Sequence, residues 1–345
     1  MKLSIVILNW NGSHHLRRFL PSVVKHSNYD WTEIVVADNH SDDDSCKIIE
    51  LEFPGVKLLR LDRNYGFAEG YNQALKNNDA EYILLLNSDV EVTENWLKPM
   101  IQIMDSHPLI GACQPKIMQL DHPEKFEYAG ASGGFIDHYG YPFCRGRLIN
   151  FQEQDLGQYN NSISVFWASG AAMLVRGKLW HEFGGFDADF WAHMEEIDLC
   201  WRMKNRGYKV VVCPESKVFH LGGGSLAYGS PQKIYLNFRN NLFLLYKNLP
   251  RDKFYKPLIL RMILDGIAAF QFLVTGQLKA FTKVSAAHRD FYRSLGKLRM
   301  KRKELLSKLV TTDHAEIYKG SLIFDFYIAK KRKFSSLHFP TNEID

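Results

Sequence analysis

Short apolar runs alternate with stretches of helical spacing over the first 110 residues. The runs are rich in Val, Ile and Leu and predict strands at 4–8, 33–37, 56–61 and 82–86. Apolar residues three and four apart predict helices at 14–26, 45–52, 66–77 and 96–107. Apolar strands separated by helices are typical of a parallel sheet covered on both faces. We therefore expect an α/β fold with a doubly wound, mostly parallel sheet that binds ligands at the carboxyl ends of its strands.

The pattern changes twice further along the chain. Residues 111–190 are rich in Gly and aromatic residues, and they predict loops and antiparallel strands, including strands at 164–168 and 171–175. A helix at 194–205 and a strand at 210–213 follow. Beyond residue 245 the chain predicts long helices, at 254–281 and 289–308. These changes indicate an α/β domain over 1–245 and a helical C-terminal extension over 246–345.

The net charge of +5 conceals a strong asymmetry between these two parts. Residues 1–245 hold 23 basic and 29 acidic side chains, whereas residues 246–345 hold 20 basic and 9 acidic ones. The basic extension predicts either a surface for an anionic partner or a solvated helical face. Arg261 and Asp265 interrupt the apolar helix at 254–281, so a helix that lies in the membrane interface or packs on the domain fits better than a membrane-spanning one.

Several classes of protein are excluded by what the sequence lacks. The five cysteines are scattered without CxxC spacing, which predicts free thiols in a reducing cytoplasm rather than a zinc or redox site. The first 12 residues have one lysine and a very short apolar run, and they lack the n-region and the small-residue cleavage site of a signal peptide. No GxGxxG follows the first strand and no P-loop motif occurs, so neither a dinucleotide-binding protein nor a P-loop NTPase is indicated.

Polar residues follow each of the predicted parallel strands, and we expect them to converge on one crevice. They are Asn9, Trp10 and Asn11, then Asp38 and Asn39, then Asp62, Arg63 and Asn64, and finally Asn87, Ser88 and Asp89. Asp89 can ligate a divalent cation that also contacts phosphate oxygens, although an Asp in this position is also a common turn former. Asp38 can accept hydrogen bonds from a nucleobase or ribose, or cap the following helix.

Three further segments carry candidate chemistry. Gly66 allows close approach of the backbone, and Arg63 can meet an anion at the start of a helix. Glu195 and Glu196 begin a predicted helix, where one of them can act as a general base or both can favour the helix N-terminus. Asp198 and Arg202, four positions apart, predict a structural ion pair. His220 precedes a run of three glycines and can be a metal ligand beside a mobile lid.

In their order and spacing these segments resemble the family 2 glycosyltransferases, which have the GT-A nucleotide-diphospho-sugar-binding fold. The similarity covers residues 1–245 and is greatest to the rhamnosyltransferase-like branch. The segments that carry it are SIVILNWNG, VVADNHSDD, RNYGFAEGYN, LLLNSDVEV, ASGAAMLVR, GGFDADFWAHMEEIDLCWR and FHLGGG.

The resemblance implies a role for each matching residue. The donor site is expected to comprise Asn9, Asn11, Asp38, Arg63, Asn64, Gly66, Asn87, Trp167 and Gly170, with Ser169 beside the last two. Asp89 and His220 would hold Mg²⁺ or Mn²⁺; the first position of the metal motif is Asn87 here rather than Asp. Glu196 falls where the family places its Asp base, and the longer side chain leaves the choice between Glu195 and Glu196 open.

We therefore expect an inverting transfer from a nucleotide-diphospho-sugar, such as dTDP-rhamnose, to a cell-surface glycan or lipid-linked acceptor. The protein would work in the cytoplasm, with residues 254–308 in peripheral contact with the anionic inner face of the plasma membrane. Nucleic acid is not an expected partner. Two alternatives remain open from the sequence: a non-catalytic sugar-nucleotide-binding module and a sugar nucleotidyltransferase.

Overall fold

The computed structural model describes residues 1–222, 229–338 and 340–344. Its N-terminal part contains the predicted parallel strands, which pair in the order β4-β1-β2-β3. Their bounds agree with the prediction to within one residue: β1 (Leu3–Asn9), β2 (Thr32–Asp38), β3 (Lys57–Arg60) and β4 (Tyr82–Asn87). The helices of this part are α1 (Ser13–His26), α2 (Ser45–Glu52), α3 (Ala68–Ala74) and α4 (Lys98–Ser106).

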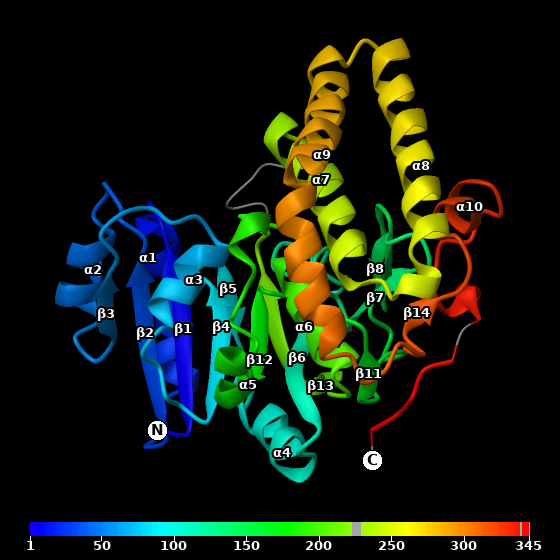
Figure 1. Cartoon of the computed structure of the whole chain (residues 1–345). Coiled ribbons are helices and arrows are strands. Elements are labelled where there is room, and N and C mark those ends of the chain that lie inside the picture. The colour runs from blue at the N-terminus through cyan, green and yellow to red at the C-terminus, as the bar shows by residue number, and fades with distance from the viewer. Residues whose placement is uncertain (223–228, 339, 345) are drawn as a thin grey trace.

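The rest of this sheet is mixed. It is built from β5 (Val90–Val92), β6 (Ile110–Gln119), β11 (Ile163–Val165), β12 (Ala172–Arg176) and β13 (Lys209–His220). Strand β12 runs antiparallel to β4 and β6 on either side, and β6 and β13 are parallel to each other. Within the described residues the sheet has nine strands, in the order β11-β13-β6-β12-β4-β1-β2-β3 with β5 beside β13. Figure 1 shows helices on both of its faces.

Both faces of the sheet are buried, as the continuously apolar strands predict. In β1, Ile5 and Ile7 belong to one hydrophobic cluster and Val6 to the other. Strand β4 alternates in the same way, with Leu84 on one side and Leu85 on the other. Since no side-chain face of these strands is free for a ligand, the polar residues at their carboxyl ends are the ones available to bind it.

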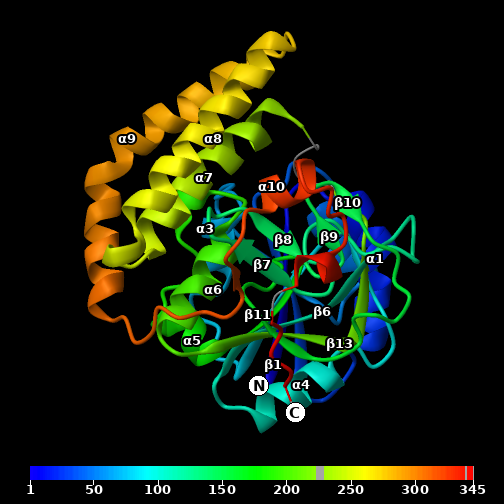
Figure 2. The ribbon, with the colours of Figure 1, turned by 90° about the vertical axis from the view of Figure 1, so that its right-hand side faces the viewer.

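A second sheet joins the C-terminal tail to the domain. It has the order β10-β9-β8-β7-β14 and comprises β7 (Gly134–Asp137), β8 (Pro142–Cys144), β9 (Arg147–Leu148), β10 (Phe151–Gln152) and β14 (Ile317–Tyr318). The tail runs across the body in Figure 2, and the amide of Ile344 donates to the carbonyl of Ser162 at 3.0 Å. The extension over 246–345 is therefore not wholly helical, because it also contains β14 and a tail that pairs with the domain.

The larger helices of the C-terminal half are α6 (Glu195–Asn205), α7 (Pro231–Asn248), α8 (Tyr255–Val274) and α9 (Leu278–Ser307), with the shorter α5 (Gly177–Glu182) and α10 (Leu322–Tyr327). Helix α7 was not predicted, and it continues through the expected domain boundary at residue 245. The helix predicted over 254–281 is interrupted by a turn in which Gly276 has a φ of 74°. Helices α8 and α9 consequently form the hairpin that rises above the body in Figure 1.

Candidate functional site

Asp89 and His220 lie side by side although 131 positions separate them. The reason is the antiparallel pairing of β5 with the end of β13, which places Val90 opposite His220. His220 Nε2 lies 3.2 Å from Asp89 Oδ1 and 3.5 Å from Asn87 Nδ2. Asp89 and His220 are buried, whereas Asn87 is partly exposed. The structure thus brings together these three residues of the predicted cation and donor site. The three glycines after His220 include two that lie outside the described residues, so the expected lid is not described.

Glu127 completes this cluster, and no signal in the sequence indicates it. Its Oε1 lies 3.5 Å from Nδ1 of His220, on the side of the ring away from Asp89. Burial alone would lower the pKa of His220, but the hydrogen bonds and charges of Asp89 and Glu127 outweigh burial and raise that pKa to about 10. A carboxylate on the second ring nitrogen orients a histidine and makes it a stronger metal ligand.

The donor set at this position fits a divalent cation. Mg²⁺ and Mn²⁺ use few protein ligands and complete their coordination with phosphate and water oxygens. One carboxylate and one imidazole, from Asp89 and His220, therefore suffice when the substrate supplies a diphosphate. Within the described ranges no group of three His, Cys, Asp or Glu side chains forms a closed metal site. The residues thus suit a cation shared with a ligand rather than a permanently enclosed one.

Asn9 and Asp38 meet where β1 and β2 end. Asn9 Nδ2 donates to Asp38 Oδ1 at 3.3 Å, and the amide of Ser41 donates to Asp38 Oδ2 at 2.9 Å. Asn9 Oδ1 is buried and has no hydrogen-bond partner among the described residues. The amide of exposed Asn11 donates to Ser41 Oγ at 2.9 Å, which fixes the loop after β1. This corner offers one free buried acceptor for a hydrogen-bond donor on a ligand.

Asn39 holds the loop after β3 in place, a role that the sequence did not indicate. Its Nδ2 donates to Asn64 Oδ1 and to the carbonyl of Gly66, both at 3.0 Å, and its Oδ1 accepts from the amide of Tyr65 at 2.9 Å. Gly66 has a φ of 74°, and a Cβ there would lie 2.6 Å from Nε1 of Trp191. Arg63 is exposed, with its guanidinium 4.6 Å from the centre of the Tyr65 ring.

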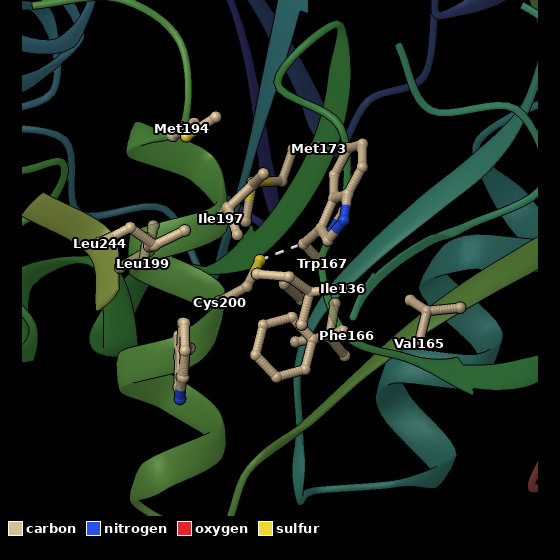
Figure 3. Close-up of a cluster of buried hydrophobic side chains, with 14 of the residues drawn as sticks. Ile136, Val165, Phe166, Trp167, Met173, Met194, Ile197, Leu199, Cys200 and Leu244 are labelled. Carbon is tan, nitrogen blue, oxygen red and sulfur yellow. Dashed lines mark hydrogen bonds between the residues drawn. The ribbon is translucent and has the colours of Figure 1, made fainter. Parts of the chain in front are cut away.

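Trp167 is a core residue, which corrects the expectation that its side chain lines the donor site. Its indole nitrogen donates to the carbonyl of Phe135 at 2.8 Å, and the ring packs among buried side chains such as Met173 and Ile197 (Figure 3). Gly170, three positions later, lies next to Phe67 and Glu196. A Cβ there would lie 3.7 Å from Phe67 and 3.9 Å from Cβ of Glu196.

Glu195 and Glu196 differ in environment although they are neighbours at the start of α6. Glu195 is buried, and Glu196 is partly exposed next to Gly170. Burial raises the pKa of Glu195 well above its usual range, and the charge of Glu196 raises it further. Burial of the Glu196 carboxylate raises the pKa of that group to about 7. The Oε2 atom of each has no hydrogen-bond partner within the described part of the chain.

The turn before these glutamates is held by α7. Trp191, His193 and Met194 have φ values of 63°, 67° and 73°, a region that costs free energy for residues other than Gly. The buried amide of Asn240 donates to the carbonyls of Phe190, Ala192 and His193 at 2.9, 2.9 and 2.7 Å. Helix α7 therefore fixes the position of Glu195 and Glu196.

A buried ion-pair network extends this support into α6 and α9. The Asp198–Arg202 pair predicted from the sequence is present at 2.8 Å, and Lys247 lies 2.9 Å from Asp198 and also contacts Asp187. Lys301 of α9 lies 2.5 Å from Asp187. The charges of Lys247 and Lys301 outweigh burial and hold the pKa of Asp187 well below its usual range. The C-terminal helices are thus tied to the turn that carries the glutamates.

The curated relatives of this chain include a rhamnosyltransferase and an O-antigen biosynthesis protein. The chain is 25% identical over 233 residues to the N-acetylglucosaminyl-diphospho-decaprenol L-rhamnosyltransferase of Mycobacterium tuberculosis, a match that covers 63% of this chain and 75% of that protein. It is also 24% identical over 225 residues to the O-antigen biosynthesis protein RfbC of Myxococcus xanthus, covering 64% of this chain and 17% of that protein.

Solved structures share the fold at low sequence identity. S. aureus TarS 1–349 in complex with UDP-GlcNAc has a TM-score of 0.56 at 16% identity, covering 89% of this chain and 88% of that one. GalNAc-T7, crystallised with UDP, GalNAc and Mn²⁺, has a TM-score of 0.55 at 19% identity, covering 72% of this chain and 48% of that one. These likenesses confirm the GT-A fold that the sequence predicts.

The sequence profile described as Glycosyl transferase family 2 matches residues 4–179, just over half of the chain. This range contains the strand ends with Asn9, Asp38 and Asp89, and the turn with Gly170. Together with the rhamnosyltransferase relative, it confirms the family expected from the sequence. The protein belongs to glycosyltransferase family 2 and is rhamnosyltransferase-like.

Proposed function

We propose that this protein is an inverting glycosyltransferase that moves a sugar from a nucleotide-diphosphate donor to a hydroxyl group of a glycan or lipid-linked acceptor. The observation that carries the proposal is the link between two chemically different parts of the crevice. The amide of Asn87 donates to the carbonyl of Ala171 at 3.0 Å, and the adjacent Gly170 faces Glu196. One short turn thus connects the Asp89–His220 pair to a carboxylate with a raised pKa.

The two ends of the crevice suit the two halves of a transfer reaction. Asn9, Asp38 and the Asn39–Asn64 pair would bind the nucleoside of the donor. Asp89 and His220 would hold Mg²⁺ or Mn²⁺, and a cation bound there supplies the charge that offsets the negative charge growing on the departing diphosphate. Glu127 would keep His220 oriented.

The environments of the two glutamates favour Glu196 as the base. Burial and the neighbouring carboxylate raise the pKa of Glu195 well above the usual range, which disfavours its ionised form. Glu196, with a pKa of about 7, is partly ionised there and accepts the proton as the acceptor hydroxyl attacks the anomeric carbon. A single base is sufficient because direct displacement forms no covalent glycosyl-enzyme.

The relatives support a more specific choice of substrates. The M. tuberculosis relative is named as a rhamnosyltransferase acting on a lipid-linked sugar diphosphate, and we carry both features over to this protein. The donor would be dTDP-rhamnose or a related sugar nucleotide. The acceptor would be a growing cell-surface glycan, presented at the cytoplasmic face of the membrane on a lipid carrier.

Release of nucleoside diphosphate from a panel of sugar nucleotides, with Mn²⁺ or with EDTA, tests the proposal. We expect one donor to be consumed, with EDTA stopping the reaction. Glu196→Gln should reduce turnover by at least about a hundredfold while leaving donor binding nearly unchanged. Glu182→Gln, at an exposed glutamate, is the matched control.

Three results would contradict the proposal. Donor binding without release would indicate a binding module, and pyrophosphate production from a nucleoside triphosphate would indicate a nucleotidyltransferase. Near wild-type turnover of Glu196→Gln would exclude Glu196 as the base. The same assay on Glu195→Gln separates the two glutamates, because loss of a residue that is not the base should not abolish the increase of activity with pH.

A further inference from the structure

Helix α8 presents a continuous apolar stripe to solvent. Its exposed members recur every three or four residues and therefore share one face of the helix. Ile259, Ile267 and Phe270 are 54%, 60% and 64% exposed, and the full set is Tyr255, Ile259, Ile263, Ile267, Phe270, Leu273 and Val274. At 1.5 Å per residue the stripe is roughly 28 Å long. An exposed apolar surface of this extent is unusual for a protein without a partner.

The opposite face of α8 is fixed to the protein by buried charges. Arg261 pairs with Asp265 at 2.7 Å, and Asp265 lies 3.1 Å from His288 of α9. The Arg261 guanidinium lies 4.2 Å from the centre of the Tyr141 ring. Residues 251–274 satisfy the length and composition of a membrane span, with 22% of the most apolar window buried. To cross a bilayer the helix would have to separate these charges from their partners, which is costly in hydrocarbon.

The charge around the stripe decides whether a second copy of the chain or an anionic lipid surface covers it. Residues 251–308 contain 14 Lys and Arg against 4 Asp and Glu. Lys256 and Lys279 are exposed close to the two ends of the stripe. A second copy of the chain would bring two such basic regions together, and like charges at an interface oppose association. An anionic lipid surface instead attracts exposed basic side chains such as Lys256 and Lys279.

The hairpin also points in a direction that suits the proposed reaction. In Figure 1 the turn between α8 and α9 rises on the same side as the carboxyl ends of the parallel strands. The other end of α9 is tied to the turn before Glu195, because Lys297 and Lys301 contact Asp189. The turn of the hairpin therefore lies on the side of the molecule where the parallel strands end.

We propose that α8 is a monotopic membrane anchor. Its Ile-rich stripe lies in the interface of an anionic bilayer, and its charged face stays on the protein. This anchoring does not depend on the proposed sugar transfer. It is compatible with an acceptor that is held at the membrane by a lipid.

Co-sedimentation of the full-length protein with vesicles tests the anchor. The vesicles are phosphatidylcholine alone or phosphatidylcholine with one third phosphatidylglycerol, and no donor or acceptor is added. We expect binding to the anionic vesicles that weakens with added salt. Changing Ile259, Ile263, Ile267 and Phe270 together to Gln should weaken this binding by about a hundredfold. The control changes Leu51 and Leu156, exposed apolar residues far from α8 in the sequence, to Gln.

Unchanged vesicle binding by the α8 variant would overturn the proposal. A second result would also overturn it: a wild-type protein that is dimeric and does not bind vesicles, together with a monomeric α8 variant. The stripe would then be covered by a second copy of the chain. A melting temperature of the variant equal to that of the wild-type protein shows that the variant is folded. Nucleoside diphosphate release in solution, measured separately, keeps a failure of the anchor distinct from a failure of the catalytic proposal.

Discussion

Replacing Asn240 with Ala should slow sugar transfer without weakening donor binding, if Glu196 is the base. The two N–H groups of the Asn240 amide are shared among the three carbonyls, so the hydrogen bonds lost are worth about 2 to 3 kcal/mol together. Three non-glycine residues in left-handed conformation cost about 3 to 6 kcal/mol at 1–2 kcal/mol each. Because these two quantities are similar, the turn at 190–194 should relax once the amide is removed. A displacement of about 1 Å at a reacting group lowers a rate by about a hundredfold.

The assay is steady-state release of nucleoside diphosphate, with kcat and the donor KM determined separately. Asn241→Ala is the matched control, because Asn241 is equally buried on α7 but donates to the carbonyl of Gly140, away from the turn. Asn240→Ala should lose about 2 to 3 kcal/mol of unfolding free energy, and Asn241→Ala, which gives up its hydrogen bond to Gly140, about 1 kcal/mol, both measured by denaturant titration. Only Asn240→Ala should lower kcat, and the pH at which its activity rises should shift as Glu196 moves.

Two results would refute this reasoning. An equal fall of kcat in both variants would mean that Asn240 acts through overall stability alone. A loss of stability in Asn240→Ala with wild-type kcat and pH dependence would mean that the turn does not control the base. A rise in donor KM with kcat unchanged would place the effect at the donor site, contrary to the position of Asn240 behind the turn.

Four further predictions follow from the geometry. With Glu196 as base, kcat should increase with pH and level off above about 7, since burial raises the pKa of that group to about 7; a flat profile between about pH 5 and 8 would contradict this. Because His220, with a pKa of about 10, must lose its proton to ligate a metal, Mn²⁺ affinity measured by EPR should increase with pH in the wild-type protein but much less in His220→Ala. Glu127→Gln should weaken Mn²⁺ binding about 10- to 100-fold, and unchanged affinity would remove its orienting role. Gly66→Ala should raise the donor KM, because the Cβ would meet Trp191 at a φ of 74°, whereas Gly55→Ala, with open space around it, should not.

The sequence predicted the parts of the site that depend on strand ends. Apolar runs located β1, β2 and β4 to within one residue, and the polar residues after them follow from that placement. Glu127 could not be found in this way, because it reaches His220 through the fold of an irregular segment without periodicity. Trp167 was misplaced for a related reason. A residue just beyond a short strand can face either the core or the crevice, and only the packing around Phe135 decides.

The opposite charges of the two parts of the chain are explained partly by their packing. Three lysines of the basic extension form ion pairs with Asp187 or Asp189 of the acidic domain: Lys247, Lys297 and Lys301. Some of the positive excess therefore serves the turn before the glutamates and is not available to a partner. The basic residues beside the exposed stripe of α8 remain, and they are the ones that a membrane can use. A protein shortened at residue 245 would lose the lysines that pair with Asp187 and Asp189 together with the basic residues beside α8, and α7 would be cut short. Single substitutions on α8 therefore separate anchoring from catalysis better than truncation does.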